Sequence, residues 1–181
     1  METNRGESLK RLVVVSNRLP FNVVESRGGF ELQETVGGLS SGMSDYLGRL
    51  RDTSIKKIEY IWVGWPGISV NDESKREGLI KMLSKFNSYP VFISEREMNN
   101  FYHGFCNSVL WPLFHYFPSY VVYNRDYWLH YKRVNETFSD RILEILKPGD
   151  IVWVHDYHLM LVPGLLRKKV RDLSIGFFLH I

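Results

Sequence analysis

Short apolar runs alternate along this chain with longer segments that carry apolar residues at a spacing of three or four. The short runs, rich in β-branched and aromatic residues, predict strands, and the longer segments predict helices. The predicted strands are residues 12–15, 58–63, 91–93, 151–154 and 175–179. The predicted helices are one opened by the glycine pair at 37–38, with apolar residues at helical spacing up to Leu50, and residues 73–86, 126–146 and about 159–170. Helical pieces rich in aromatics are predicted from 95 to about 116.

This alternation predicts the α/β class, with a Rossmann-like, mostly parallel sheet flanked by helices. The runs that begin at Leu12, Ile151 and Ile175 are apolar at consecutive positions, as expected of strands covered on both faces. We expect one domain over residues 12–181, preceded by a polar tail at 1–11. Ligands of such sheets bind beyond the carboxyl ends of the strands, so the residues there are the candidates for function.

Composition and charge narrow the function classes. The net charge of +3 is small and is spread along the chain, which disfavours a nucleic-acid partner. The lone cysteine, Cys106, excludes an internal disulfide and is most simply a buried structural residue. Residues 1–11 contain no apolar leader, and no run is long enough to span a membrane, so we expect a cytoplasmic protein.

The polar residues beyond the predicted strands form a coherent chemical set. They are Arg18, Trp65, the His-Asp-Tyr-His run at 155–158, and His180. A guanidinium can bind a phosphate with two parallel hydrogen bonds, a carboxylate accepts from hydroxyls, and an aromatic face covers a sugar ring. Together these side chains predict a site for a phosphorylated sugar.

Each of these residues also has a structural interpretation. Arg18 can be a surface arginine at a strand end, and the glycine pair at 37–38 can be a simple turn rather than an anion site at a helix N-terminus. The spacing there is not G-x-G-x-x-G, which disfavours a dinucleotide-dependent dehydrogenase.

Neighbouring residues such as those of the run 155–158 rarely converge on one metal ion, so no metal is expected. His158 is interpreted as a structural residue. The aromatic segment 101–116 is typical of buried core.

Six blocks of sequence, in order, resemble the trehalose-6-phosphate synthases of glycosyltransferase family 20. They are LVVVSNRLP at 12–20, VGGL at 36–39, WVGW at 62–65, Phe101-Tyr102 followed by NSVLWP at 107–112, DIVWVHDYHL at 150–159, and GFFLHI at 176–181. The resemblance covers nearly the whole chain. It implies the N-terminal, acceptor-side portion of a retaining GT-B glycosyltransferase, which transfers glucose from UDP-glucose to glucose 6-phosphate.

The resemblance also implies two groups of site residues. The group that would hold the acceptor, glucose 6-phosphate, is Arg18, Trp65, Tyr102, Trp111 and Asp156. The group that would hold the donor, UDP-glucose, is Gly38 and His180, and the residues nearest the chemistry would be His180 and Asp156. The mechanism of the family is described as a front-face substitution in which the departing phosphate takes the acceptor proton. No cofactor or metal is implied, and no pair of carboxylates placed as in a retaining glycosidase is evident.

Two other functions stay open at this point. One is a related synthase with a different phosphorylated acceptor, such as glycerol phosphate, and the other is a noncatalytic module that binds a sugar phosphate within a larger synthase complex. The chain ends at Ile181, whereas the resembled family continues into a C-terminal nucleotide-sugar domain. We therefore expect a fragment that does not turn over alone, with an exposed apolar sheet edge, and a homo-oligomer or a synthase complex as its possible assembly.

Overall fold

A computed structural model describes residues 11–26, 29–34 and 59–180. Its main sheet has five strands, all parallel, in the order β5-β4-β1-β6-β7. The strands are β1 (Leu12–Arg18), β4 (Tyr60–Trp65), β5 (Ser88–Pro90), β6 (Ile151–His155) and β7 (Ser174–Phe178). The predicted α/β class with a mostly parallel sheet is confirmed. The glycine pair at 37–38 and the helix expected after it lie outside the described residues.

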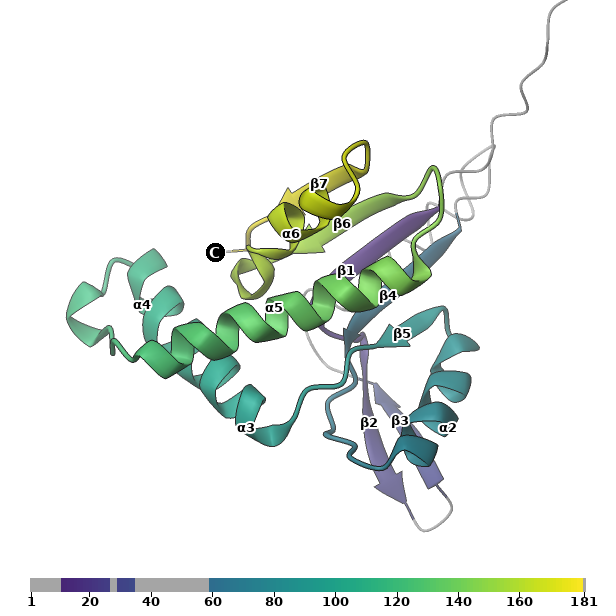
Figure 1. The fold of residues 1–181 in the computed structure, drawn as a ribbon. Helices are drawn as coiled ribbons and strands as arrows, with labels where there is room; N and C mark the ends of the chain where they lie inside the picture. The colour runs from purple at the N-terminus through teal and green to yellow at the C-terminus, as the bar shows by residue number, and fades with distance from the viewer. Residues whose placement is uncertain (1–10, 27–28, 35–58, 181) are drawn as a thin grey trace, which may run out of the picture.

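Two apolar cores lie on opposite faces of this sheet, as expected for strands with consecutive apolar residues. Val13 and Val15 of β1 pack into one core with residues of β6 and of the helices α5 (Arg125–Ile145) and α6 (Val162–Lys169). Val14 points the other way, toward the core that includes Leu79 and Leu83 of α2 (Glu73–Ser84). Figure 1 shows α5 crossing one face of the sheet, with α2 away from it on the other side of β5.

The helices begin where side chains can satisfy their free backbone N–H groups. Asp72 caps α2 by accepting from the amide of Lys75 at 2.9 Å, and Asn124 caps α5 by accepting from the amide of Asp126 at 2.8 Å. Phe86, the last residue of the predicted helix 73–86, lies beyond the end of α2 and is 53% exposed. Its ring touches Phe21 edge-on rather than the core.

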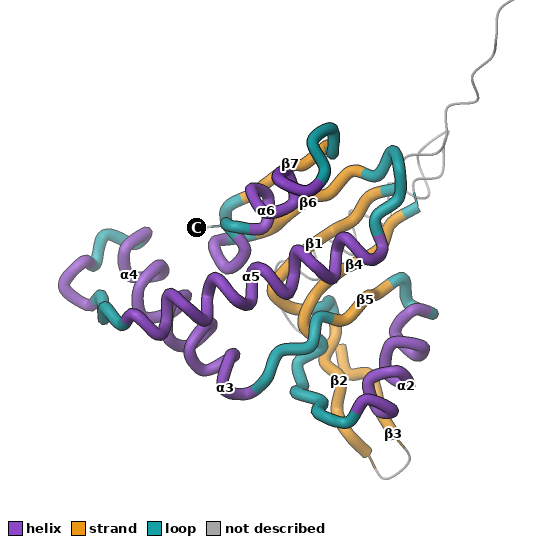
Figure 2. The backbone as a smooth tube through the Cα atoms, in the orientation of Figure 1, coloured by secondary structure: helices purple, strands orange, loops and turns teal. Residues whose placement is uncertain are grey.

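A hairpin after β1 was not predicted. Strands β2 (Phe21–Ser26) and β3 (Gly29–Glu34) form a separate antiparallel pair, drawn beneath the main sheet in Figure 2. Val23 of β2 is buried in the α2-side core. The hairpin could not be predicted from apolar runs because its strands mix polar and apolar residues.

The third predicted strand was placed too late in the chain. Strand β5 is Ser88–Pro90, and residues 91–94 continue without strand pairing. Val91 and Ile93 are nevertheless buried, because they enter the α5-side core from the segment that follows. The apolar run at 91–93 therefore reflects burial of these side chains rather than a strand.

The aromatic segment is helical but only partly buried. It runs from α3 (Glu95–Met98) through a π-helix, η1 (Asn99–Leu110), to α4 (Trp111–Phe114) and the short turn η2 (Pro118–Tyr120). Phe101 is fully buried, whereas Trp111 is 45% and Tyr116 is 92% exposed. The expectation of a buried aromatic core is thus correct for the first half of the segment and wrong for the second, which extends away from the sheet in Figure 1.

Strand β7 forms one edge of the sheet, next to β6. Phe177 and Phe178 are 42% and 50% exposed there, as expected from the sequence.

The helix predicted for 159–170 begins later than expected. Residues Tyr157–Leu159 form a 3-10 turn, η3, and α6 begins only at Val162, with Pro163 in its first turn. His158 therefore lies in that turn rather than at the start of a long helix.

Candidate functional site

Arg18 and Trp65 meet at the carboxyl ends of two adjacent strands. They are the last residues of β1 and β4, they are partners in the strand register, and the guanidinium carbon of Arg18 lies 4.9 Å from the centre of the Trp65 ring. A cation over an aromatic face is stabilised by the electrons of the ring. Trp65 therefore orients Arg18 while leaving its N–H groups available to an anion.

The backbone around Arg18 is held by a residue of its own strand and by the neighbouring strand β4. The hydroxyl of Ser16 donates to the carbonyl of Arg18 at 2.6 Å and accepts from the indole N–H of Trp62 at 2.7 Å. Gly64 makes the close approach of β4 possible, because a Cβ there would lie 2.8 Å from the backbone carbon of Arg18. These contacts fix the point from which the arginine side chain extends.

Asn22 of β2 and Arg18 both lie close to Gly67 in the loop after β4. Gly67 has φ +88°, and a Cβ at this position would lie 2.9 Å from Oδ1 of Asn22 and 3.1 Å from Nη2 of Arg18. Oδ1 of Asn22 is buried without a hydrogen-bond partner. A glycine is thus required here both by its backbone angle and by the space that Arg18 and Asn22 occupy.

Asp156 follows β6 in a backbone conformation that non-glycine residues rarely adopt. Its φ of 76° and ψ of 162° fall in a region populated almost only by glycine, and such strain concentrates at functional sites. Oδ1 accepts from the amide of Tyr157 at 2.7 Å, and Oδ2 lies 3.2 Å from Nδ1 of His158. The strained turn therefore holds a partly buried carboxylate at the edge of the sheet.

The environment of Asp156 favours its charged form. Burial alone would raise its pKa, but the imidazole of His158 and the amide of Tyr157 lower it, so the net pKa lies below the ordinary value. The carboxylate is therefore ionised at neutral pH and can accept hydrogen bonds from hydroxyl groups.

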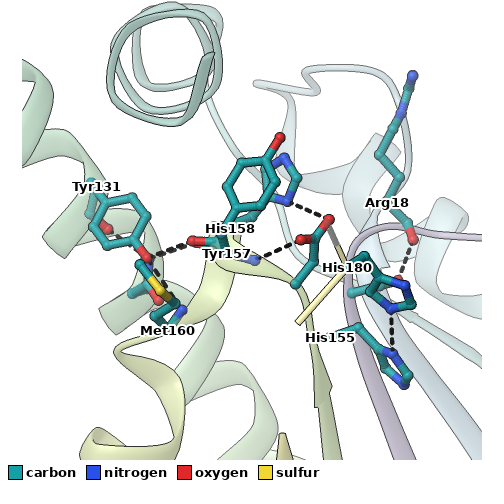
Figure 3. A network of polar contacts seen from close by, with 10 residues as sticks. Arg18, Tyr131, His155, Tyr157, His158, Met160 and His180 are labelled. Atoms are coloured by element: carbon teal, nitrogen blue, oxygen red, sulfur yellow. Dashed lines mark hydrogen bonds and ion pairs between the residues drawn. The ribbon is translucent and has the colours of Figure 1, made fainter. Parts of the chain in front are cut away.

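Three rings stack next to this carboxylate. The ring of His158 lies between Tyr102 of η1, at 5.5 Å and 10°, and Tyr157, at 4.3 Å and 23°. The hydroxyl of Tyr131 on α5 donates to the carbonyl of Tyr157 at 2.8 Å, and Figure 3 shows this contact beside His158. The stack joins the predicted residues Tyr102 and Asp156 through His158.

His180 lies beyond β7 and contacts a residue for which the sequence predicted no separate role. Its Nε2 is 3.1 Å from Nδ1 of His155, the last residue of β6, and the two rings face each other in Figure 3. The sequence placed His155 beyond the predicted strand 151–154, as part of the run 155–158, but assigned it no role of its own; in the structure it is the last residue of β6.

Trp111 lies in a different environment from the other predicted residues. It is on α4, where its ring stacks on His115 with the ring centres 4.1 Å apart. It also lines a pocket of about 450 Å³ formed by the end of η1, α4 and the turn η2. The residues around this pocket are Asn107, Ser108, Trp111, Pro112, Phe117, Tyr120 and Val122. Gly38, predicted for the donor, lies outside the described residues.

The described residues contain no group of three or more His, Cys, Asp or Glu side chains that could hold a metal ion. Cys106 is buried, and burial raises the pKa of its thiol well above the ordinary value, which fits the structural interpretation. In the same part of the chain, no helix combines the length and hydropathy that crossing a bilayer requires.

The chain belongs to a family of sugar-transferring enzymes: it is a member of glycosyltransferase family 20, whose sequence model matches residues 10–181. The UDP-forming alpha,alpha-trehalose-phosphate synthase A of Dictyostelium discoideum is 44% identical over 172 residues, which are 94% of this chain and 22% of that protein. The 56 kDa synthase subunit of Saccharomyces cerevisiae is 38% identical over 93% of this chain and 34% of its own length. The chain thus spans between 22 and 34% of these curated relatives.

Solved structures agree with this assignment. The Escherichia coli structure bound with UDP-2-fluoro glucose is 33% identical, with a TM-score of 0.68 over 95% of this chain and 33% of that one. A Burkholderia xenovorans trehalose-phosphate synthase in complex with glucose-6-phosphate is 27% identical, with a TM-score of 0.68 and the same coverage. The fold is therefore that of part of a GT-B trehalose-phosphate synthase.

Proposed function

We propose that this chain forms the acceptor side of an enzyme that transfers glucose from UDP-glucose to glucose 6-phosphate, giving trehalose 6-phosphate. The observation that carries the proposal is the stacked pair of Arg18 and Trp65 at the same sheet edge as the strained, ionised Asp156. Family membership and the ligands named for two relatives support the choice of substrates.

The two halves of the acceptor would be recognised by different chemistry. Arg18 would bind the phosphate through its free N–H groups, and the carboxylate of Asp156 would accept hydrogen bonds from ring hydroxyls. Tyr102, held against His158, would add an aromatic edge. Trp111, whose ring stacks on His115, is included in the proposed acceptor site by resemblance to the family.

In the proposed reaction, the bond between the anomeric carbon and the diphosphate oxygen breaks and a bond to an acceptor hydroxyl oxygen forms. The proton of that hydroxyl goes to the departing diphosphate. The residues of this chain would orient the acceptor and would stabilise the donor through His180 and Gly38. The proposal requires no metal or cofactor, and it places the protein in the cytoplasm.

Binding is the direct test, because the chain spans about a third or less of its curated relatives. The chain should be titrated with glucose 6-phosphate, glucose and glycerol phosphate by calorimetry or chemical-shift mapping. We expect glucose 6-phosphate to bind most tightly, and Arg18→Ala to weaken it by about 10-fold or more through loss of a charge-assisted contact.

Arg76→Ala is a matched control, because Arg76 also stacks on an aromatic ring, that of Phe92 at 5.1 Å, but belongs to α2. It should leave the affinity unchanged. Equal binding of glycerol phosphate would favour the related synthase, and equal binding of unphosphorylated glucose would contradict the role of Arg18. A folded chain that binds none of the three would contradict an acceptor site formed by these residues alone.

A further inference from the structure

His155 lies directly behind His180 and is almost completely buried. Its side chain is at the end of β6, the residue is 1% exposed, and its Nδ1 is 3.1 Å from Nε2 of His180. The two rings are 5.4 Å apart between centres and inclined by 28°. Such contact between two imidazoles restricts both rings, because only one of the two facing nitrogens can carry the proton.

The surroundings of His155 keep it neutral. Burial lowers the pKa of this imidazole to about 4, the charge of His180 lowers it too, and Asp156 opposes the shift. The rings of Trp153, 4.4 Å away, and Phe178, 6.4 Å away, pack around it. Nε2 of His155 is buried without a hydrogen-bond partner.

The unpartnered Nε2 indicates which nitrogen of His155 carries the proton. If Nε2 carried it, a buried N–H donor would be left without an acceptor, and orphaned buried donors are rarer than orphaned acceptors. The proton is better placed on Nδ1, which then donates to Nε2 of His180. In neutral His180 the remaining proton must lie on Nδ1, because Nε2 accepts a hydrogen bond.

We propose that His155 is a positioning residue that fixes the ring and the tautomer of His180, so that His180 presents an Nδ1–H donor at the sheet edge. An N–H donor suits an oxygen ligand, such as a sugar hydroxyl or a phosphate oxygen of the donor substrate. This inference deepens the proposed function and relies on it only for the identity of that ligand. The tautomer itself is a property of the free chain.

The test is the ring-nitrogen spectrum of the chain labelled with 15N-histidine, recorded near pH 8 without ligand. Long-range 1H–15N correlations distinguish a protonated ring nitrogen from a bare one. We expect His180 as the Nδ1–H tautomer, in contrast to free imidazole side chains, which favour Nε2–H. Assignment of its signals comes from their loss in His180→Gln.

Two variants separate positioning from packing. His155→Phe keeps a ring but removes the donor, so His180 should revert to Nε2–H; His155→Asn keeps an N–H donor near the same place and should restore Nδ1–H. Amide spectra of both variants establish that they are folded. The inference is overturned if His180 is Nε2–H in the unaltered chain, or if Nδ1–H persists in His155→Phe. Neither result depends on whether glucose 6-phosphate binds.

Discussion

The position of the Arg18 side chain depends on Gly67, which leaves space for it because glycine has no side chain. A Cβ at Gly67 would lie 3.1 Å from Nη2 of Arg18, so Gly67→Ala should push the guanidinium off the ring of Trp65. The positive φ of Gly67 adds backbone strain of about 1 kcal/mol or more to the variant. We expect several-fold weaker glucose 6-phosphate binding with only a modest loss of stability, measured by calorimetry and urea unfolding.

Gly78→Ala is the natural control for that variant. Gly78 lies within α2, and a Cβ there would meet nothing within 4 Å. Alanine in a helix interior should raise the free energy of unfolding by about 0.5–1 kcal/mol. Its affinity for glucose 6-phosphate should not change, and a loss equal to that of Gly67→Ala would mean that the effect is not local to Arg18.

The depressed pKa of His155 predicts acid sensitivity. His155 is buried and neutral in the folded chain, whereas in the unfolded chain it takes up a proton at a higher pH. The free energy of unfolding therefore falls as pH decreases from about 6.5 to about 4. The loss should reach about 1–3 kcal/mol across this window. Urea unfolding at several pH values measures it, and the slope should be smaller in His155→Phe.

The lowered pKa of Asp156 acts in a lower range of pH. Its stabilising effect is present above the pKa of an unfolded aspartate and is lost as pH falls through the still lower folded pKa. A slope between pH 6.5 and 4 that survives in His155→Phe would contradict the assignment to His155.

At the scale of single residues, position relative to a strand end was the most informative signal. Arg18, Trp65, Asp156 and His180 were selected because they follow apolar runs, and the structure places all four at strand ends. The contact between His155 and His180 could not be predicted, because it depends on the register of β6 against β7. Register is a property of the folded sheet rather than of either segment.

Among the elements, α5 and the turn after β6 are joined by one buried amide. Asn135 is fully buried, donates to the carbonyls of Tyr131 and His158, and accepts from the amide of Leu161. Asn135→Ala would leave buried backbone groups unpaired. The free energy of unfolding should fall by about 2–4 kcal/mol in urea titrations.

Thr137→Ala provides the comparison on the same helix. The hydroxyl of Thr137 also donates to a carbonyl, that of Arg133, but this contact is exposed. The expected change is within about 0.5 kcal/mol. Similar losses in both variants would show that Asn135 stabilises α5 locally instead of joining it to the site.

The elements differ in how far sequence reasoning could place them. Long periodic segments such as α5 were predicted within one residue at each end. The π-helical η1 was predicted only as helical pieces, because its hydrogen bonds run from residue i to i+5 and its side chains do not follow the 3.6-residue period. At Gly104 of η1, an added Cβ would lie 2.6 Å from Cδ1 of Tyr127, so α5 packs too closely there for a larger residue.

In the whole molecule, a buried ion pair that stabilises the fold and the predicted binding site lie at opposite ends of the strands. At the amino end of the sheet, Arg11 donates two hydrogen bonds to Asp150, at 3.1 and 2.6 Å, and the side chain of Asp150 is 3% exposed. The predicted site lies at the opposite, carboxyl end. The sheet order supports that position. β1 lies between β4 and β6, so the order of the strands reverses at β1, and ligands of such sheets bind beyond the carboxyl ends of the strands at that point.

Arg11→Met should therefore destabilise the fold by about 3–5 kcal/mol, because it leaves a buried carboxylate unpaired. Affinity for glucose 6-phosphate should be unchanged at a temperature where the variant is folded. Thermal unfolding and calorimetry measure the two quantities. The double variant Arg11→Met/Asp150→Asn should recover part of the stability, and a loss of affinity in either variant would contradict the separation.

The strained backbone at Asp156 makes this position informative in other members of the family. Its angles suit glycine, so a carboxylate persists there only against a local conformational preference of about 1–3 kcal/mol. Its contacts with Tyr157 and His158 offset part of this strain, and use by a ligand would add a second reason to retain the carboxylate. A relative with glycine at the equivalent position would thus be a candidate for a noncatalytic module, and one that retains aspartate would be a candidate for an active enzyme.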